Sequence, residues 1–326
     1  MIALRALITG VAGFAGSHLA EYLVNHTDLD IIGVAREGSD LSNIAHLGGR
    51  VTVREGNVVS PEFVQSVIRE NHPDYVFHLA AQAAPAHSWS DPQQTLVNNT
   101  LGQLNVLQAA VAAQLDCRIL VVGSGDEYGL VRPTELPVGE SNPLRPNNPY
   151  AVSKICQDML GLQYFISHQL PVVRVRPFNH IGPRQSDAFV CSSFARQVAE
   201  AEIGLHEPVV KVGNLDARRD FTDVRDMVRA YWLAISQGEP GEVYNIGSGV
   251  AWSISDILRS LLDKSRTRIR VEQDPSRLRP SDVPVVCCDF SKFRARTGWE
   301  PRFPLEESLA EVLDYWRQRL VKPRAE

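Results

Sequence analysis

The chain has 326 residues, of which 44% are hydrophobic and 22% charged, and its net charge is −5. The basic residues are scattered and form no Lys/Arg tract, which argues against a nucleic-acid-binding protein. No apolar stretch reaches the roughly 20 residues that span a bilayer, and no signal peptide is recognisable. The five cysteines lack metal-ligand spacing and a paired framework. We therefore expect a cytoplasmic protein with reduced thiols, no metal, and no membrane or nucleic-acid partner.

The first half of the chain alternates short β-branched runs with longer amphipathic segments. We expect strands at residues 3–9, 31–35, 51–54, 75–79, 118–122 and 172–175. We expect helices at residues 13–25, 61–70, 92–114 and 149–168. Strands that alternate with helices and lack strict polar alternation indicate a parallel sheet covered on both faces. This half therefore predicts an α/β fold with a Rossmann-type doubly wound sheet.

The pattern after Arg176 is less regular. We expect helices at residues 187–204, 224–237, 254–262 and 305–320, and strands at 209–212 and 242–246. The stretch from Ser253 to Asp256 resembles a capping box that opens the third of these helices. The expected division is a larger domain from residues 1–177 plus about 217–247. A smaller, interleaved α/β C-terminal domain takes about 178–216 plus 248–326 and covers the cleft.

A glycine-rich turn follows the first strand. Residues 9–19 read TGVAGFAGSHL, in which Gly10, Gly13 and Gly16 have the spacing G-x-x-G-x-x-G. Gly10 permits a tight turn, Gly13 lets backbone N–H groups approach a pyrophosphate, and Gly16 lets helix and strand pack closely. Because the turn joins a strand to a helix, it predicts a dinucleotide site that includes Phe14 and Ala15. The alternative is a purely structural turn.

The ends of the second and third strands bear on the choice of dinucleotide. An NAD site usually has an acidic residue after the second strand, whereas this chain has Arg36, which can pair with a 2′-phosphate. Arg36 therefore favours NADP(H) and leaves NAD(H) open, although a merely solvated arginine is the alternative. Asn57 and Val58 lie where such folds hold the adenine edge, and turn formation explains Asn57 almost as well.

Tyr150 and Lys154 give the strongest indication of catalysis. They are four residues apart on an expected helix and so lie on one face. A free tyrosine has a pKa of about 10. We expect the Lys154 charge and a nicotinamide cation to favour the phenolate. Ser124 follows a buried-type strand, and although a loop serine is the alternative, we expect its hydroxyl to face the same cleft.

These motifs resemble those of the extended short-chain dehydrogenase/reductase family, almost from end to end. Matching stretches are HLAA at residues 78–81, NTLG at 99–102 and RPFNHIGP at 176–183. The resemblance implies that Ser124 and Tyr150 bind the reacting oxygen and that Lys154 holds the nicotinamide ribose. It also implies cofactor contacts from Leu79, Ala80, Ala81, Asn99 and Phe178.

Two stretches of the second half, residues 176–185 and 211–226, resemble family members that act on GDP-linked deoxyhexoses. This implies NADPH-dependent reduction of the C4 ketone of GDP-4-dehydro-6-deoxy-D-mannose to GDP-D-rhamnose. The larger domain would bind NADP and the smaller one the nucleotide sugar, with Arg219 and Arg279 on the pyrophosphate, unless they are only surface arginines. The other implied substrate contacts are Ser124, Asp126, Asn179, Val209 and Lys211. Guanine specificity rests on the resemblance alone.

Other functions stay open. A GDP-mannose 4,6-dehydratase needs an acid–base carboxylate beside the trio of Ser124, Tyr150 and Lys154. In such enzymes this carboxylate belongs to a glutamate two residues after a threonine. Here Ser124 replaces the threonine, the shorter Asp126 takes the glutamate position, and Glu127 is shifted by one residue. Another nucleotide-sugar epimerase or dehydratase is a further alternative. A dinucleotide-binding redox sensor is the non-enzyme alternative, although such sensors typically lose the Tyr or Lys.

Relatives of this type usually form homodimers through helices that correspond to residues 92–114 and 149–168. Apolar residues on these helices permit the same pairing here, and core packing explains them equally well. These residues are Leu104, Leu107, Ala110, Leu160, Leu162 and Phe165.

Overall fold

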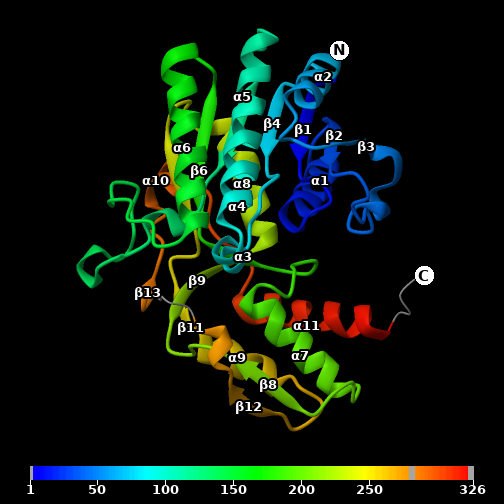
Figure 1. Ribbon diagram of the computed structural model, residues 1–326, viewed down its shortest axis with the longest axis vertical. Coiled ribbons are helices and arrows are strands. Elements are labelled where there is room, and N and C mark those ends of the chain that lie inside the picture. Colours follow the sequence, from blue (N-terminus) through cyan, green and yellow to red (C-terminus); the bar gives the residue numbers. More distant parts are fainter. Residues whose placement is uncertain (1–2, 279–282, 322–326) are drawn as a thin grey trace.

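The computed structural model describes residues 3–278 and 283–321. Its centre is a seven-stranded parallel sheet with the order β10-β6-β5-β4-β1-β2-β3 (Figure 1). The strands are β1 (Arg5–Thr9), β2 (Asp30–Ala35), β3 (Val51–Glu55), β4 (Tyr75–His78), β5 (Arg118–Val122), β6 (Val172–Pro177) and β10 (Val243–Ile246). The doubly wound α/β fold is therefore confirmed. The strand order reverses between β1 and β4, which places a crevice at the carboxyl ends of these strands.

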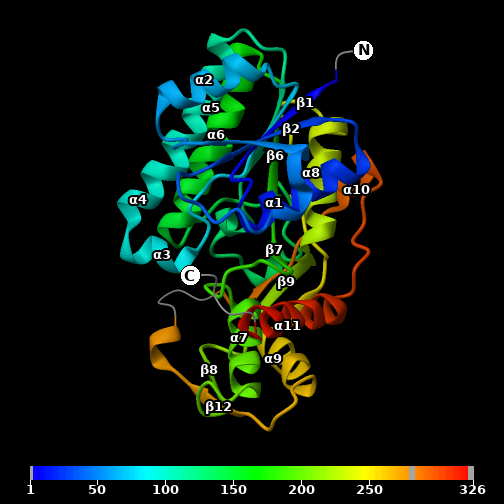
Figure 2. The same ribbon diagram turned by 90° about the vertical axis from the view of Figure 1, so that its right-hand side faces the viewer.

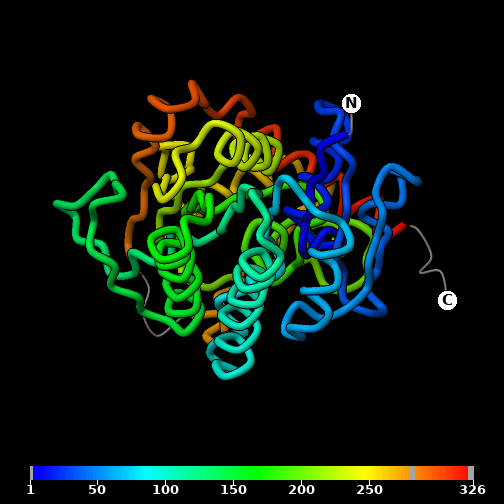
Figure 3. The backbone as a smooth tube through the Cα atoms, turned by 90° about the horizontal axis from the view of Figure 1, so that it is seen from above, coloured from blue at the N-terminus to red at the C-terminus, as the bar shows by residue number. Residues whose placement is uncertain are grey.

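Helices cover both faces of the sheet (Figures 2 and 3). One face carries α2 (Pro61–Asn71), α5 (Gly102–Ala112) and α6 (Pro149–His168), and the other carries α1 (Phe14–His26), α8 (Val224–Gln237) and α10 (Ser291–Thr297). Strand β6 is buried at every position, as expected for a strand covered on both sides.

A second, smaller part lies beyond the carboxyl edge of the sheet (Figure 1). Its strands are β7 (Asn179–Ile181), β8 (Val209–Val212), β9 (Arg218–Asp223), β11 (Ala251–Ser253), β12 (Arg270–Gln273) and β13 (Val285–Val286). Its helices are α7 (Val190–Glu202), α9 (Ile254–Asp263) and α11 (Leu305–Val321). These helices share a core of their own around Phe194, Leu258 and Trp316. The exact domain boundaries stay a prediction.

Several elements differ from the sequence-based prediction. The expected helix at 92–114 consists of α4 (Pro92–Leu96), a π-helical turn (Val97–Leu101) and α5. The unpredicted elements are α3 (Pro85–Ser90), α10, β7, β9, β11, β12 and β13, most of which are too short to show a period. The cap before α9 is confirmed, because the Ser253 hydroxyl accepts the Asp256 N–H at 3.0 Å. No helix in the described part of the chain is long and apolar enough to cross a membrane.

Candidate active site

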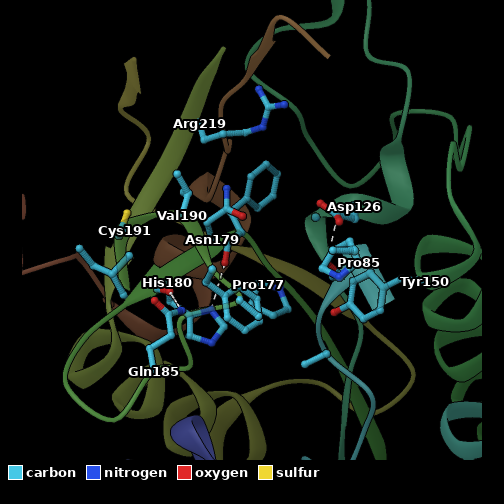
Figure 4. Close-up of a pocket in the computed structure, with 18 of the residues that line it drawn as sticks. Pro85, Asp126, Tyr150, Pro177, Asn179, His180, Gln185, Val190, Cys191 and Arg219 are labelled. Atoms are coloured by element: carbon cyan, nitrogen blue, oxygen red, sulfur yellow. Dashed lines mark hydrogen bonds between the residues drawn. The ribbon is translucent and has the colours of Figure 1, made fainter. Parts of the chain in front are cut away.

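A cleft of about 910 Å³ lies between the carboxyl edge of the large sheet and the smaller part. Figure 4 shows Tyr150 and Asp126 on one side of it, Arg219 and Val190 on the other, and Asn179 between them. The predicted site residues that line it are Gly10, Gly13, Phe14, Ala15, Gly16, Leu79, Ala81, Ser124, Asp126, Tyr150, Lys154, Phe178, Asn179 and Arg219. Within the described ranges, no group of three or more His, Cys, Asp or Glu side chains could hold a metal ion.

The glycine turn has the geometry that a dinucleotide requires. Gly10 has a φ of +74°, and a Cβ there would lie 3.0 Å from the Ala80 nitrogen. A Cβ on Gly16 would lie 2.1 Å from the Gly10 carbonyl oxygen, so only glycine lets α1 start this close to β1. Gly13 is the N-cap of α1 and brings no side-chain cap, which leaves N–H groups of the first turn for an anion. These features fit a bound pyrophosphate.

The end of β4 is fixed to the glycine turn by Thr9. The Thr9 hydroxyl accepts the backbone N–H groups of Leu79 and Ala80, each at 3.1 Å, and contacts Nδ1 of His78 at 2.9 Å. Burial, with the nearby Lys154 charge, lowers the pKa of His78 to about 3. His78 is therefore a neutral core histidine that fastens two strand ends together, and it does not line the cleft.

The predicted trio converges at one end of the cleft. Helix α6 begins at Pro149 and is capped by Asn148, so Tyr150 and Lys154 occupy its first turns on one face. The Lys154 Nζ lies 5.8 Å from the centre of the Tyr150 ring and donates to the Val122 carbonyl at 2.9 Å. The Ser124 hydroxyl hydrogen-bonds to the Tyr150 phenol. Tyr150 thus contacts both Lys154, on the same helix, and Ser124, in the turn after β5.

The electrostatics of Tyr150 differ from the expectation. Burial, together with the charges of Asp126 and Glu127, raises the pKa of the phenol, and the hydrogen bond with Ser124 offsets this only in part. The expected lowering by Lys154 is wrong for the protein alone, because desolvation of the buried phenolate dominates. Burial also lowers the pKa of Lys154 to about 8. At neutral pH, Tyr150 therefore holds its proton firmly.

The two carboxylates after Ser124 point in different directions. Asp126 lines the cleft and is close enough to Tyr150 to affect its pKa. Glu127 is fully buried and is not part of the cleft lining. Its Oε1 accepts the Ser124 backbone N–H at 2.8 Å, and its Oε2 lies 3.0 Å from Nε of Arg176. The carboxylate next to the trio on the cleft side is thus the shorter aspartate.

Five predicted cofactor residues lie outside the cleft lining: Arg36, Asn57, Val58, Ala80 and Asn99. Arg36 is exposed at the end of β2, beyond the cleft. The Asn57 side chain accepts the Val59 N–H at 2.9 Å and so stabilises the turn after β3, which is the alternative to an adenine contact. Val58 packs against the apolar core under α2 and α5. The Ala80 backbone N–H donates to the Thr9 hydroxyl at 3.1 Å.

Asn99 has a structural role rather than a place in the cleft. It is fully buried in the π-helical turn, where its Oδ1 accepts the Gln82 N–H at 2.7 Å. Its Nδ2 donates to the Ser153 hydroxyl at 2.9 Å, and Ser153 lies between Tyr150 and Lys154 on α6. Asn99 therefore ties the loop after β4 to the catalytic helix. Its Nδ2 uses both hydrogens, on the Ser153 hydroxyl and the Gln82 carbonyl, and a contact of Asn99 with the cofactor stays a prediction.

The predicted substrate residues are only partly brought together. Val209 and Lys211 lie on β8, and neither lines the cleft. Lys211 is exposed on the outer side of this strand, where its backbone pairs with the Gln197 side chain. β8 pairs with β12 and its alternate residues face the small core, so this strand does not flank the cleft. Arg279 lies outside the described residues.

Sequence reasoning missed several lining residues, most of them on loops or short elements. They include Trp89, His180, Gln185, Asn214 and Arg277. His180 stacks on Phe14 with 5.6 Å between ring centres, which joins the glycine turn to β7. Arg277 donates to the Ser193 hydroxyl at 3.3 Å across the far end of the cleft. His180 and Gln185 lie in the matching stretch 176–185 and Asn214 lies in 211–226, so the family motifs carried a signal for these three, whereas no spacing identifies Trp89 or Arg277.

Comparison with known proteins supports a specific family. The family described as GDP-mannose 4,6 dehydratase matches residues 7–312. The chain is 38% identical to a GDP-6-deoxy-D-mannose reductase of Pseudomonas aeruginosa, covering 97% of this chain and 98% of the relative. It is 28% identical to a GDP-mannose 4,6-dehydratase of Yersinia enterocolitica, covering 95% and 92%.

Solved structures agree with this assignment. The structure of RMD from Pseudomonas aeruginosa complexed with NADPH matches with a TM-score of 0.84 at 34% identity, over 97% of this chain and 100% of that one. A UDP-glucose 4-epimerase of Thermotoga maritima matches with a TM-score of 0.86 at 27% identity, over 97% and 100%. The chain therefore belongs to the GDP-mannose 4,6-dehydratase family of extended short-chain dehydrogenases/reductases, and it is a nucleotide-sugar oxidoreductase that uses a nicotinamide dinucleotide.

Proposed function

We propose that this protein reduces the C4 ketone of GDP-4-dehydro-6-deoxy-D-mannose with NADPH and so forms GDP-D-rhamnose. The observation that carries this proposal is the direction of Glu127, which is buried behind the trio, so that among the residues the structure describes no glutamate lines the cleft beside Tyr150. A ketone reductase needs only a proton donor and a partner for the oxygen, and Tyr150 and Ser124 supply both. The reductase relative at 38% identity supports the same choice.

Dehydration is the second candidate, and Asp126 is the observation that favours it. Its carboxylate lines the cleft near Tyr150, where a dehydratase needs an acid–base group. An aspartate is one methylene shorter than a glutamate, and a misplacement of about 1 Å costs on the order of a hundredfold in rate. Asp126 is therefore a poor substitute, and reduction remains the better proposal.

The side chains act as follows. Bound NADPH supplies the hydride that reduces the C4 ketone. Tyr150 donates its proton to the C4 oxygen, and its raised pKa ensures that it carries this proton at neutral pH. The Ser124 hydroxyl hydrogen-bonds the same oxygen and orients it. One of the three N–H groups of the Lys154 ammonium donates to the Val122 carbonyl, and the other two can donate to the cofactor ribose.

Arg36 supports a preference for NADP(H). It is exposed directly after β2, where the ribose of a dinucleotide on the glycine turn lies in this fold. A guanidinium there can pair with a 2′-phosphate, whereas NADH offers no such group. We infer a preference for NADP(H) over NAD(H).

The substrate diphosphate is assigned to the far wall of the cleft. Arg219 on β9 lines this wall, where one guanidinium nitrogen donates to the Val283 carbonyl at 2.6 Å and holds the side chain in place. Asn179 is exposed in the cleft at the start of β7, between Arg219 and the trio. A GDP-sugar that spans the cleft would thus place its sugar at Tyr150 and its phosphates near Arg219.

We also propose a homodimer, formed through exposed apolar residues other than those named under Sequence analysis. Leu107 and Ala110 are buried in the core, and Leu104, Leu160 and Phe165 pack against it. The exposed apolar residues of α6 are Val152, Met159 and Ile166, spaced seven apart and 40%, 37% and 62% exposed. Val97 and Leu101 are exposed on the π-helical turn, which contacts α6. We infer that this stripe on α6, with the turn beside it, pairs with a second copy.

Product analysis by NMR tests the proposed function. The purified protein is incubated with NADPH and GDP-4-dehydro-6-deoxy-D-mannose, and separately with GDP-mannose and NADP⁺. Reduction of the ketone to a GDP-6-deoxyhexose, with no reaction of GDP-mannose, is the expected result. Formation of GDP-4-dehydro-6-deoxy-D-mannose from GDP-mannose with loss of water, and no oxidation of NADPH when that ketone is supplied, would establish the dehydratase instead.

A further inference from the structure

A group of buried charged side chains lies directly behind the trio, on the side away from the cleft. It consists of Glu127 after β5, Asp158 on α6, and Arg174 and Arg176 on β6, all of them buried. Charged groups are almost never fully buried unless they are paired, and a buried ion pair is weak evidence for stability. The position of this group next to Ser124 therefore suggests a role in the site.

Glu127 holds the backbone from which Ser124 projects. Its Oε1 accepts the Ser124 N–H at 2.8 Å, and the Ser124 hydroxyl in turn accepts the Asp126 N–H at 3.1 Å. The bond from the Ser124 N–H to Glu127 is one half of a capping box on the 3₁₀ turn Gly125–Tyr128, whose other half joins the Ser124 side chain to the Glu127 backbone. A Cβ on Gly123 would lie 2.1 Å from the Glu127 Oε1, so the glycine at that position makes room for the carboxyl group.

The same carboxyl group connects this turn to the catalytic helix. Its Oε2 forms an ion pair with the Arg176 Nε at 3.0 Å, and the N–H of that nitrogen donates to Oδ2 of Asp158 at 3.0 Å. Asp158 follows Lys154 by four residues and Tyr150 by eight, so all three lie on one face of α6. The chain of contacts from Ser124 through Glu127, Arg176 and Asp158 therefore fixes the turn against α6.

We propose that Glu127 is a positioning residue for the reaction: its carboxyl group aims Ser124 at Tyr150 and fixes the Ser124 turn to the helix that carries Tyr150 and Lys154. Glu127 does not reach the cleft, so it acts through Ser124 and through the charge of Lys154. The catalytic part of this inference rests on the proposed function. The structural part does not.

The charged surroundings indicate which form of Glu127 performs this task. Asp158, Lys154 and Tyr150 face it from α6 and Arg176 from β6. Burial and the Asp158 carboxylate raise the pKa of Glu127, although Arg176 and the Ser124 N–H oppose the shift. At neutral pH the protonated form is favoured, and a glutamine imitates it. As the pH rises through about 8, Glu127 ionises, and its negative charge then raises the pKa of Lys154, so a variant without that charge has a lower Lys154 pKa in the alkaline range.

Two substitutions separate positioning from simple folding. Glu127→Gln keeps the oxygen that accepts the Ser124 N–H, whereas Glu127→Leu removes it. We expect Glu127→Gln to keep kcat at neutral pH within about threefold, and Glu127→Leu to lower kcat about a hundredfold with little change in KM. We also expect the alkaline limb of the kcat/KM profile to move to lower pH in Glu127→Gln. Glu70→Gln, in an exposed ion pair with Arg54, is the matched control.

A readout without turnover keeps the inference separate from the proposed function. Backbone amide exchange of the turn Gly125–Tyr128 and of Ser124 should be faster in Glu127→Leu and unchanged in Glu127→Gln. If the wild type turns over neither substrate, the proposed function fails, and exchange still tests the positioning. Wild-type kcat and exchange in a folded Glu127→Leu would overturn the inference. If that variant does not fold, an unshifted alkaline limb in Glu127→Gln would overturn it.

Discussion

The two walls of the cleft hold their polar groups in different ways. On the wall formed by β5 and α6, Tyr150 and Lys154 are only 8% and 5% exposed and are fixed by a capped helix and a capping box. On the opposite wall, Asn179 on β7 and Arg219 on β9 are more open to solvent. The first wall is suited to chemistry that demands exact placement, and the second to binding a long, anionic ligand. Substitutions on the two walls should therefore affect different kinetic constants.

Loss of the Tyr150 hydroxyl should give the largest effect. We expect Tyr150→Phe to lower kcat about a thousandfold, because the proton donor is gone, while the Kd for NADPH stays unchanged. Stopped-flow reduction and fluorescence titration of NADPH check the two halves of this prediction. Tyr315→Phe, on α11 away from the cleft, is the matched control. Retention of activity in Tyr150→Phe would show that another group supplies the proton.

Removal of Arg219 should weaken binding and spare the chemistry. We expect Arg219→Ala to raise KM for the GDP-sugar about 10- to 100-fold with kcat nearly constant, since a charge-assisted hydrogen bond contributes about 1.5–3 kcal/mol. Steady-state kinetics on Arg219→Ala and on its neighbour Arg218→Ala provide the measurement and its control, because Arg218 is exposed and does not line the cleft. A fall in kcat alone would remove the distinction between the walls.

The charge of Lys154 should set the alkaline limit of activity. Because burial lowers the pKa of Lys154 to about 8, the ammonium loses its proton as the pH rises through this value. We expect kcat/KM to fall about tenfold per pH unit above that point, and to be level just below it. Lys154→Arg should move this limb upwards while lowering the activity overall. A wild-type profile that stays flat far above pH 8 would contradict the assignment.

Arg36 should affect only the choice of cofactor. We expect Arg36→Ala to raise KM for NADPH about tenfold and to leave KM for NADH unchanged, because only NADPH carries the 2′-phosphate. Kinetics with both cofactors test this, with the exposed Arg50→Ala as control. Equal changes for both cofactors would show that Arg36 does not recognise the phosphate.

The smallest effect on catalysis should come from the exposed stripe on α6. We expect Ile166→Glu to convert a dimer into a monomer in sedimentation experiments, because a charge at a paired apolar position is not tolerated. The kcat should change little, since Ile166 is remote from the cleft lining. A wild-type protein that sediments as a monomer would refute the proposed pairing.

Local sequence patterns predicted the chemical wall well. The spacing of Gly10, Gly13 and Gly16, and of Tyr150 and Lys154, lies within a single turn or helix, and Ser124 directly follows a strand. Such features depend on neighbours in the chain, so their geometry follows from the element that contains them. The raised pKa of Tyr150 could not be predicted, because it results from burial by distant segments.

The opposite wall was predicted poorly for the same reason. Arg277 and Asn214 reach the cleft from loops or turns with no periodic pattern. Lys211 fitted the family motif, but the pairing of β8 with β12 turns it to the outer surface. The buried role of Glu127 depends on Arg176 and Asp158, which are 49 and 31 residues away and leave no trace in local spacing.

Transfer of deuterium from NADPH that carries deuterium at both positions of nicotinamide C4 tests the central claim most directly. If Ser124, Tyr150 and Lys154 hold the ketone beside the nicotinamide, the label will appear at C4 of the GDP-6-deoxyhexose and nowhere else in the sugar. Product that lacks the label, or that instead takes up solvent deuterium at C5, would contradict reduction at this site.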